Sequence, residues 1–312
     1  MIPFWFFPYA IALGNTVLIK PSERTPLTMT RIMELIELAG IPAGVVSLLH
    51  GGKEVVDTLL DDERVPAVSF VGSSKVARYV YGRAAGNGKR VQCGGGAKNP
   101  LVIMPDADLD MTVQIAADSA FGNAGQRCLA ASLAITVGDA RKYFTEAICE
   151  TAKNRVVGSG LDSHVQMGPV ITQESKDRLA GYIDRYASSG GRVLVDGRKP
   201  AVDEFPQGFF IRPSVLDDIT PDHEIATTEL FGPVLGLMHV ETLDEAIQII
   251  NHSKYGNMAC IFTSNGSSAR KFRYEVNAGN IGVNIGVAAP MAFFPFSGWK
   301  ESFFGDMHGQ AM

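Results

Sequence analysis

Short β-branched runs alternate with amphipathic stretches along most of the 312 residues. In the first third of the chain, this pattern predicts strands at residues 16–20, 45–51 and 65–72, and helices at residues 27–40, 54–60 and 75–85. Strands separated by helices normally pair in parallel, because each helix carries the chain back across the sheet. The alternation therefore predicts an α/β fold with parallel sheets.

The same alternation continues to the C-terminal part of the chain. The predicted strands are residues 101–104, 133–137, 191–197, 258–263 and 279–285, and the predicted helices are residues 105–121, 140–152, 175–189, 243–253 and 269–276. Aspartates near the start of the helix at 105–121 suit the positive end of a helix dipole. Residues 191–208 indicate a surface hairpin and loop. We expect two α/β lobes.

The apolar opening at residues 1–13 is predicted to be a buried helix. It carries no basic residue of the kind that starts a signal peptide, and a strand-like run follows it at once. Pro3 and Pro8 interrupt it, and it is too short to cross a bilayer. We therefore expect neither a secretion signal nor a membrane span here.

Composition excludes several classes of protein. The chain is 46% hydrophobic and 20% charged, which is typical of a globular enzyme, and its net charge of −5 argues against nucleic-acid binding. Four scattered cysteines form no disulfide framework or metal clip, so a reducing compartment is expected, either a bacterial cytoplasm or a mitochondrial matrix. The six histidines show no ligand spacing, and no metal is predicted.

Cys128 is the candidate nucleophile, within the run FGNAGQRCLAAS. It follows a glycine-containing turn and precedes small residues that could open a helix, an arrangement that exposes the sulfur. Backbone N–H groups at such a place stabilise a thiolate and lower the thiol pKa. The alternative is that a lone cysteine is a small buried hydrophobic residue, as expected for Cys149 and Cys260.

The run around Cys128 resembles the active-site signature of the aldehyde dehydrogenase superfamily, in which a glycine-glutamine-x-cysteine sequence carries the nucleophile. The run TVLIKPSERTP resembles the family's adenosine-ribose turn, which implies cofactor-binding roles for Lys20, Glu23 and Arg24. A carboxylate at position 23 would repel a 2′-phosphate, so NAD is expected rather than NADP. Without the resemblance, Lys20 and Glu23 would be interpreted as an exposed turn.

Three further motifs agree with the resemblance and follow in the family's order. FVGSS implies that Ser73 meets the cofactor pyrophosphate at a helix start, where free N–H groups favour anions. TTELFGPVLGL implies that Glu229 holds the nicotinamide ribose, with Phe231 beside the ring. FPFSGWKESFFGD, after the expected strand at 279–285, is the last motif. Taken alone, Ser73 could be a plain helix cap and Glu229 a surface carboxylate.

Family members that hydrolyse the thioester carry a glutamate about 34 residues before the cysteine, as a general base for water. In this chain that position is Gly94, in the run VQCGGGAKN, and glycine cannot accept a proton. Glycines here could also allow close backbone approach to the cofactor, which implies a binding role for Gly95. Loss of the base fits the CoA-acylating branch, in which the thiol of coenzyme A takes the acyl group.

Arg127 is the strongest indication of substrate within that branch. An arginine beside the nucleophile can pair with a carboxylate, which malonate-type semialdehydes carry. The resemblance to methylmalonate/malonate-semialdehyde dehydrogenases implies oxidation to propionyl-CoA or acetyl-CoA with loss of carbon dioxide, with NAD as cofactor and CoA as co-substrate. The alternative is a structural arginine that binds nearby carbonyls.

The implied fold is aldehyde-dehydrogenase-like: an incomplete Rossmann-type NAD-binding domain at 1–97, an α/β catalytic domain at 98–295, and a return segment at 296–312. Relatives carry further N-terminal strands, an asparagine that donates to the oxyanion, and a C-terminal strand used in dimers or tetramers. We therefore expect a chain truncated at both ends. In the family, the other oxyanion donor is the backbone N–H of the nucleophile, here Cys128; Asn123 is not the family's asparagine.

Two alternatives remain open at this point. One is a hydrolytic NAD-dependent aldehyde dehydrogenase that uses a different base. The other is a non-catalytic fragment that binds nucleotide or a partner subunit. A requirement for CoA would separate the first alternative from the acylating enzyme, and the reactivity of the Cys128 thiol would test the second.

Overall fold

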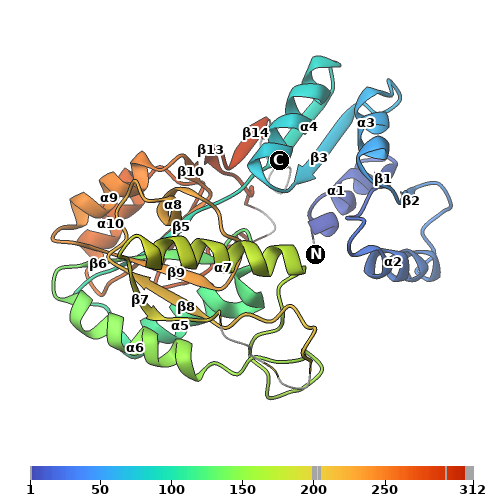
Figure 1. The fold of residues 1–312 in the computed structure, drawn as a ribbon. Helices are drawn as coiled ribbons and strands as arrows, with labels where there is room; N and C mark the ends of the chain where they lie inside the picture. The colour runs from blue at the N-terminus through green and yellow to red at the C-terminus, as the bar shows by residue number, and fades with distance from the viewer. Residues whose placement is uncertain (1, 199–201, 203–204, 292–293, 306–312) are drawn as a thin grey trace. The chain divides into compact units, whose positions relative to one another are not determined.

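The computed structural model describes residues 2–198, 202, 205–291 and 294–305. The chain forms an α/β fold, as predicted, and divides into two compact units (Figure 1). Unit 1 comprises Met1–Gly95, Pro290–Ser297 and Phe303–Met312, and unit 2 comprises Gly96–Ala289 and Gly298–Ser302. Each unit has its own sheets and its own buried core, and the two are described separately.

Unit 2 is built on a seven-stranded sheet in the order β12-β11-β5-β6-β9-β8-β7. The strands are β5 (Asn99–Ile103), β6 (Ala131–Val137), β7 (Arg192–Val195), β8 (Ser214–Asp217), β9 (Val234–Val240), β11 (Met258–Phe262) and β12 (Asn280–Val283). All neighbouring pairs are parallel except β7 and β8, which are antiparallel. The central strands are buried along most of their length, as expected for a sheet covered on both faces. The predicted parallel arrangement is confirmed.

Helices connect these strands, and polar caps fix where several of them begin. They are α5 (Leu109–Phe121), α6 (Ala140–Asn154), α7 (Gln173–Ser188), α8 (Glu224–Thr227), α9 (Leu243–His252) and α10 (Gly266–Glu275), and a short antiparallel pair links β10 (Tyr255–Gly256) to β13 (Trp299–Lys300). The Asp108 carboxylate accepts a hydrogen bond from the Met111 N–H at the start of α5. Asp108 therefore stabilises the N-terminus of α5, as predicted, whereas the Asp106 carboxylate accepts from Thr263 and Ser264.

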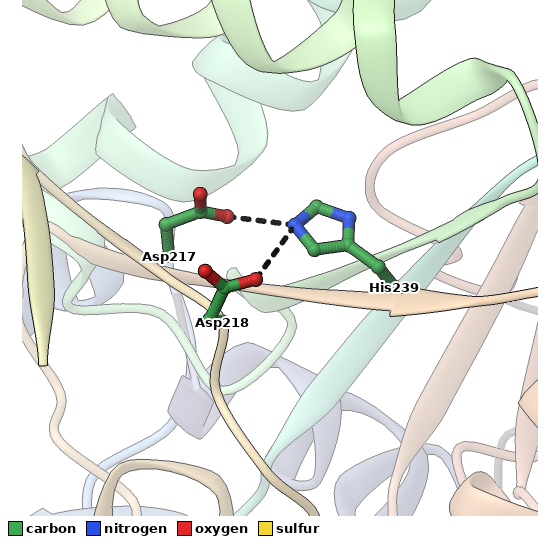
Figure 2. A group of neighbouring side chains, drawn as sticks. All are labelled: Asp217, Asp218 and His239. Carbon is green, nitrogen blue, oxygen red and sulfur yellow. Dashed lines mark hydrogen bonds and ion pairs between the residues drawn. The ribbon is translucent and has the colours of Figure 1, made fainter.

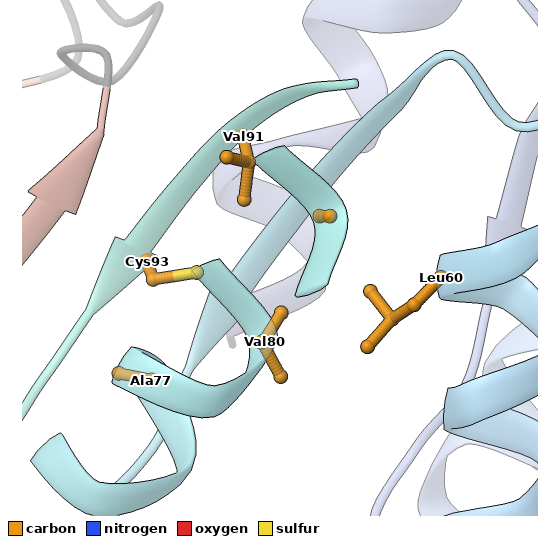
Figure 3. Close-up of a cluster of buried hydrophobic side chains, with 6 residues drawn as sticks. Leu60, Ala77, Val80, Val91 and Cys93 are labelled. Atoms are coloured by element: carbon orange, nitrogen blue, oxygen red, sulfur yellow. The ribbon is translucent and has the colours of Figure 1, made fainter. Parts of the chain in front are cut away.

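Unit 1 contains two small sheets. Strands β1 (Val17–Ile19) and β2 (Val46–Leu48) pair in parallel, β3 (Ala67–Val71) pairs in parallel with β4 (Arg90–Gly94), and β14 (Phe303–Gly305) joins β4 antiparallel. Its helices are η1 (Ile2–Trp5), α1 (Phe7–Ala12), α2 (Pro26–Leu38), α3 (Lys53–Asp61) and α4 (Ser74–Gly86). One core lies between α3, α4 and β4 (Figure 3); its buried residues are Leu60, Ala77, Val80, Ala84, Val91 and Cys93.

The N-terminal segment is helical, but the prediction that it is buried is wrong. Among residues 2–13, only Phe7 is buried. It packs with Ile19 and other residues of the β1–β2 core, whereas Leu13 is 79% exposed. A six-residue helix turns only one side toward so small a core, and its remaining apolar side chains stay partly accessible. No helix within the described ranges has both the length and the hydropathy of a membrane span.

Sequence analysis did not predict β4, β8 and β9, nor the shorter strands β10, β13 and β14. β4 contains Gln92 and Gly94, residues of low strand propensity, and overlaps the glycine-rich run VQCGGGAKN. β8 has only four residues and follows Pro213. β9 begins with the last four residues of the motif TTELFGPVLGL, to which no secondary structure was assigned. For β4 and β8, pairing with neighbouring strands overrides a weak local signal.

Candidate active site

Cys128 lies in a tight connection between a helix and a central strand. α5 ends at Phe121, the turn η2 (Gly122–Gly125) follows, and β6 begins at Ala131. Asn123, Ala124 and Gly125 all have positive φ, at 53°, 51° and 67°, so the chain reverses direction within a few residues. The helix expected after Cys128 is therefore wrong: the small residues there lead into a strand that lies between β5 and β9.

Two glycines bring this turn into contact with the segment after Glu229. A Cβ atom at Gly125 would lie 2.2 Å from the carbonyl oxygen of Gly232, closer than any side chain permits. Gly125 also has a positive φ, which only glycine adopts without strain. The turn that carries Cys128 and the Glu229–Gly232 segment therefore touch through their backbones.

One small pocket lies at this contact. Its lining includes Arg127, Cys128, Glu229 and Phe231, together with the strand-start residue Asn99. Motifs about 100 residues apart in the sequence thus meet at one place within unit 2. Asn123 is not free to serve as a donor there, because its amide donates to the Gln126 carbonyl (3.0 Å) inside the turn.

The electrostatic setting of Cys128 differs from the expectation. Burial is the main cause that raises the pKa of the thiol, and the nearby Glu229 carboxylate raises it further. The backbone N–H groups of Cys128 and Leu129 and the Arg127 guanidinium lower it, as predicted for the turn, but they do not outweigh burial. Burial raises the pKa of Cys93 and Cys260 to about 12 and that of Cys149 to about 11.

Glu229 is half-buried and is not a freely exposed surface carboxylate. Its Oε1 accepts a hydrogen bond from the Ala97 N–H at 3.0 Å. Burial raises the pKa of Glu229, and that N–H group, Lys98 and Arg178 oppose the rise. Lys98 is 4% exposed, its ammonium has no hydrogen-bond partner in the described structure, and burial lowers its pKa to about 7 against the pull of Glu229. Sequence analysis missed Lys98, because no pattern marked it as buried.

Arg127 lines the pocket but also binds the backbone behind it. Its Nη2 donates to the carbonyl oxygens of Asp118 (2.6 Å) and Ser119 (3.1 Å), and its Nε is buried without a partner among the described residues. The Asp118 carboxylate is already held by Arg155 at 3.0 Å. Burial lowers the pKa of Arg127; the Asp118 carboxylate, which Arg155 also binds, opposes this fall, and the positive charge of Arg155 adds to it. The Arg127 charge is therefore poorly compensated.

Unit 1 holds the remaining candidate cofactor residues. The Lys20 ammonium donates to the Gly51 carbonyl at 2.7 Å and to Glu23 at 3.4 Å, while the Glu23 side chain is 64% exposed. A backbone hydrogen bond and Lys20 lower the pKa of Glu23, which therefore stays ionised. Arg24 is exposed in the same turn. Ser73 occupies the position before α4, but its hydroxyl does not cap that helix.

The glycines at the end of β4 also belong to unit 1. Gly94 and Gly95 are both buried. A Cβ atom at Gly94 would lie 3.5 Å from Val71 Cγ2, which is an ordinary van der Waals contact, and Gly94 does not have a positive φ. The backbone therefore does not require glycine at position 94.

Comparison with known proteins decides the family. The model of the aldehyde dehydrogenase family matches residues 1–312. The chain belongs to the aldehyde dehydrogenase family. Malonate-semialdehyde dehydrogenase 2 of Geobacillus kaustophilus is 49% identical over 312 residues, which are 100% of this chain and 64% of that protein. The family resemblance drawn from the motifs is confirmed, and this aldehyde dehydrogenase chain spans about 64% of the length of that relative.

Solved structures agree with this family assignment. The methylmalonate-semialdehyde dehydrogenase of Oceanimonas doudoroffii is 43% identical, with a TM-score of 0.96 over 99% of this chain and 63% of that one. A Sinorhizobium meliloti 1021 protein solved in complex with NAD is 42% identical, with a TM-score of 0.97 over 99% of this chain and 64% of that one. The aldehyde dehydrogenase fold of this chain is thereby established.

This aldehyde dehydrogenase chain has a second polar cluster in unit 2 that sequence analysis did not find (Figure 2). His239 Nε2 lies 2.7 Å from Asp217 Oδ1 and 3.9 Å from Asp218 Oδ1. The three ligand atoms could surround a cation, but Arg192 lies within 3.0 Å of both carboxylates and Arg141 within 2.8 Å of Asp218. The arginines already neutralise these carboxylates, so the cluster is an ion-pair network that joins β8 to β9.

Proposed function

We propose that this chain carries the nucleophile and the substrate carboxylate site of an NAD-dependent, CoA-acylating oxidation of malonate or methylmalonate semialdehyde. The observation that carries the proposal is the position of Arg127: a poorly compensated cation lines the same pocket as the Cys128 thiol. A substrate with a carboxylate near its aldehyde would bring the missing counter-ion to Arg127. Its aldehyde carbon would then face the sulfur.

The chemistry assigned to Cys128 follows from its thiolate. The thiolate attacks the aldehyde carbon, and the carbonyl oxygen becomes an oxyanion that the backbone N–H of Cys128 can stabilise. Loss of hydride from this adduct, which NAD would accept when bound, leaves a thioester on Cys128. The substrate's β-carboxylate leaves as carbon dioxide, and the carbon that carried it takes up a proton. The sulfur of CoA, after loss of its proton, takes the acyl group and releases the Cys128 thiolate. Malonate semialdehyde gives acetyl-CoA, and methylmalonate semialdehyde gives propionyl-CoA.

Transfer to CoA, and not to water, is supported by Gly94. Hydrolytic members of the family use a glutamate at that position to activate water, and glycine supplies no base. Because the backbone at position 94 has room for a Cβ atom, packing alone does not account for the glycine. A thiol loses its proton far more readily than water does, and the resulting thiolate attacks a thioester without that base.

Several residues fit an NAD role in this proposal. The Glu23 carboxylate is ionised and mostly exposed, so it can accept a hydrogen bond from a ribose hydroxyl. Lys20 lies beside it. Ser73 has a hydroxyl not used for capping at the start of the 13-residue helix α4, where free N–H groups attract phosphate. Gly95 follows directly after β4, and Glu229 and Phe231 line the Cys128 pocket. NAD, when bound, supplies the hydride acceptor.

NADH formation from malonate semialdehyde, with and without CoA, tests the proposed function. We expect turnover that requires CoA and is lost in Cys128→Ala. Turnover that is indifferent to CoA would favour hydrolysis instead. If Cys128→Ala retained turnover, the nucleophile assignment would be wrong.

A second experiment tests Arg127 separately. Propanal has the same aldehyde group as malonate semialdehyde but lacks the carboxylate. We expect Arg127→Gln to lower kcat/KM for malonate semialdehyde by roughly tenfold or more, because a charge-assisted pair is lost, and to leave propanal nearly unchanged. Equal losses on both aldehydes would show that Arg127 only supports the turn through the Asp118 and Ser119 carbonyls.

A further inference from the structure

Two buried asparagines converge on the carbonyl oxygen of Cys128. Asn99 Nδ2 donates to it at 2.8 Å, and Asn257 Nδ2 also donates to it at 2.8 Å. Asn99 is the first residue of β5, and Asn257 directly precedes β11. Both lone pairs of this carbonyl are therefore occupied by side chains from two other strands.

Each asparagine is itself held in place. Asn99 is 2% exposed; its Nδ2 also donates to the Ala130 carbonyl at 2.9 Å, and its Oδ1 accepts from the Met258 N–H at 3.1 Å. Asn257 is 4% exposed, and its own carbonyl accepts from the N–H (2.9 Å) and the side-chain amide (3.0 Å) of Asn280. The Asn99 amide cannot rotate without breaking buried hydrogen bonds to Ala130 and Met258, and the main chain at Asn257 is fixed by Asn280.

This arrangement fixes the peptide group between Cys128 and Leu129. In a trans peptide the C=O and the N–H point in opposite directions, so fixing the carbonyl also fixes the following N–H. The Leu129 N–H lowers the pKa of the Cys128 thiol, so it favours the thiolate form. Hydrogen bonds to a carbonyl also polarise the peptide and make its N–H a stronger donor.

We propose that Asn99 and Asn257 are positioning residues for the nucleophile: together they bind the Cys128 carbonyl and so orient the Cys128–Leu129 peptide with its N–H toward the sulfur. The inference rests on the proposed function of Cys128. It extends that function to two residues that act on the nucleophile through its backbone carbonyl.

A purely structural role would have a different signature. Asn99 could serve only to tie β5, β11 and the turn together, in which case its loss would loosen the turn without changing the acidity of the thiol. The two roles separate in the pH profile of the Cys128 thiol. A positioning role predicts that the profile moves to higher pH when a donor is lost, whereas a loosened turn predicts faster alkylation at every pH.

The test measures iodoacetamide labelling of each cysteine by mass spectrometry, as a function of pH, on the full 312-residue chain. The variants are Asn257→Leu, which keeps the number and branching of the side-chain heavy atoms but removes the donor, and Asn99→Ser. Asn257→Ser replaces Asn257→Leu if the leucine variant does not unfold cooperatively. Asn251→Ala is the matched control: Asn251 also bonds two backbone groups, at Glu275 and Asn277, but does not contact Cys128.

We expect each variant at 99 or 257 to move the Cys128 midpoint upward by about half to one pH unit, which slows labelling near neutral pH roughly threefold to tenfold. The control should leave the midpoint unchanged. Unchanged midpoints in the variants, or an equal change in Asn251→Ala, would overturn the inference. A parent Cys128 that fails to label at any pH would contradict the proposed function itself, because labelling requires no turnover.

Discussion

Glu229 Oε1 accepts a hydrogen bond from the backbone N–H of Ala97 at 3.0 Å. This contact connects the segment after α8 to the residues just before β5, and it holds the Glu229 carboxylate in the pocket of Cys128. The position of the negative charge is therefore set by backbone geometry. The effect of the Glu229 charge on the Cys128 thiol can be measured.

Glu229→Gln should make Cys128 more reactive in the absence of cofactor. Glutamine keeps an oxygen to accept from Ala97, so the change removes only the charge that raises the thiol pKa. We expect the pH midpoint for alkylation to fall and the rate near neutral pH to rise roughly threefold. Glu150→Gln, at an exposed position on α6, is the control. An unchanged midpoint would show that the carboxylate does not act on the sulfur.

Lys98→Met should stabilise the protein, and the gain should depend on pH. The folded-state pKa of Lys98 is about 7, below its ordinary value of 10.5, so the unfolded chain binds more protons between those values. Stability of the parent therefore rises with pH across this window. We expect the advantage of Lys98→Met in free energy of unfolding to shrink by on the order of 3 kcal/mol between about pH 7 and pH 10.

Urea unfolding at several pH values measures this difference. Lys153→Met, at an exposed position on α6, should change stability by less than about 0.5 kcal/mol at every pH. A constant advantage of Lys98→Met across the window would mean that Lys98 does not titrate there in the folded state.

Much of the α/β framework could be predicted from the sequence, because apolar periodicity reports directly on burial. The strand at 101–104 and the helix at 105–121 correspond to β5 and α5 within a few residues. β4 was missed because Gln92, Cys93 and Gly94 carry little strand propensity by themselves. Their extended backbone comes from pairing with β3 and β14, which a local pattern does not contain.

The residues of the candidate site could be predicted from the sequence, but their burial, pKa shifts and hydrogen-bond partners could not. Motifs identified Cys128, Arg127 and Glu229, which do meet at one pocket. The balance of burial against N–H donors at Cys128 depends on the tertiary fold, so the expected fall in thiol pKa was wrong. Asn257 also carried no sign in the sequence of its contact with the nucleophile, 129 residues away.

Gly125→Ala should be strongly destabilising. The new Cβ would lie 2.2 Å from the Gly232 carbonyl oxygen, at a residue with φ of 67°. We expect a loss of more than about 2 kcal/mol in unfolding free energy. Gly181→Ala, within helix α7 of the same unit, meets only an ordinary contact at 3.5 Å and should stabilise by about 0.5–1 kcal/mol. Changes of the same sign in a thermal melt would contradict the proposed backbone contact.

Asp217→Ala should weaken unit 2 more than Asp218→Ala. The Asp217 side chain is 2% exposed and binds both His239 and Arg192, whereas that of Asp218 is 42% exposed. We expect a loss of about 2 kcal/mol for Asp217→Ala, because His239 loses a buried partner, and less than about 1 kcal/mol for Asp218→Ala. Denaturant unfolding compares them, and equal losses would mean that burial of Asp217 does not strengthen the network.

The backbone conformation at Gly94 bears on how transfer to CoA and hydrolysis could interchange on this fold. Its backbone lies in the ordinary region, and a Cβ atom there would meet Val71 at 3.5 Å. A mutation from glycine to a larger residue at this position therefore meets no barrier from the local backbone. If transfer to CoA and hydrolysis differ by the side chain at position 94, then the two chemistries are neighbours in sequence space, and a lineage could cross between them without rebuilding a strand.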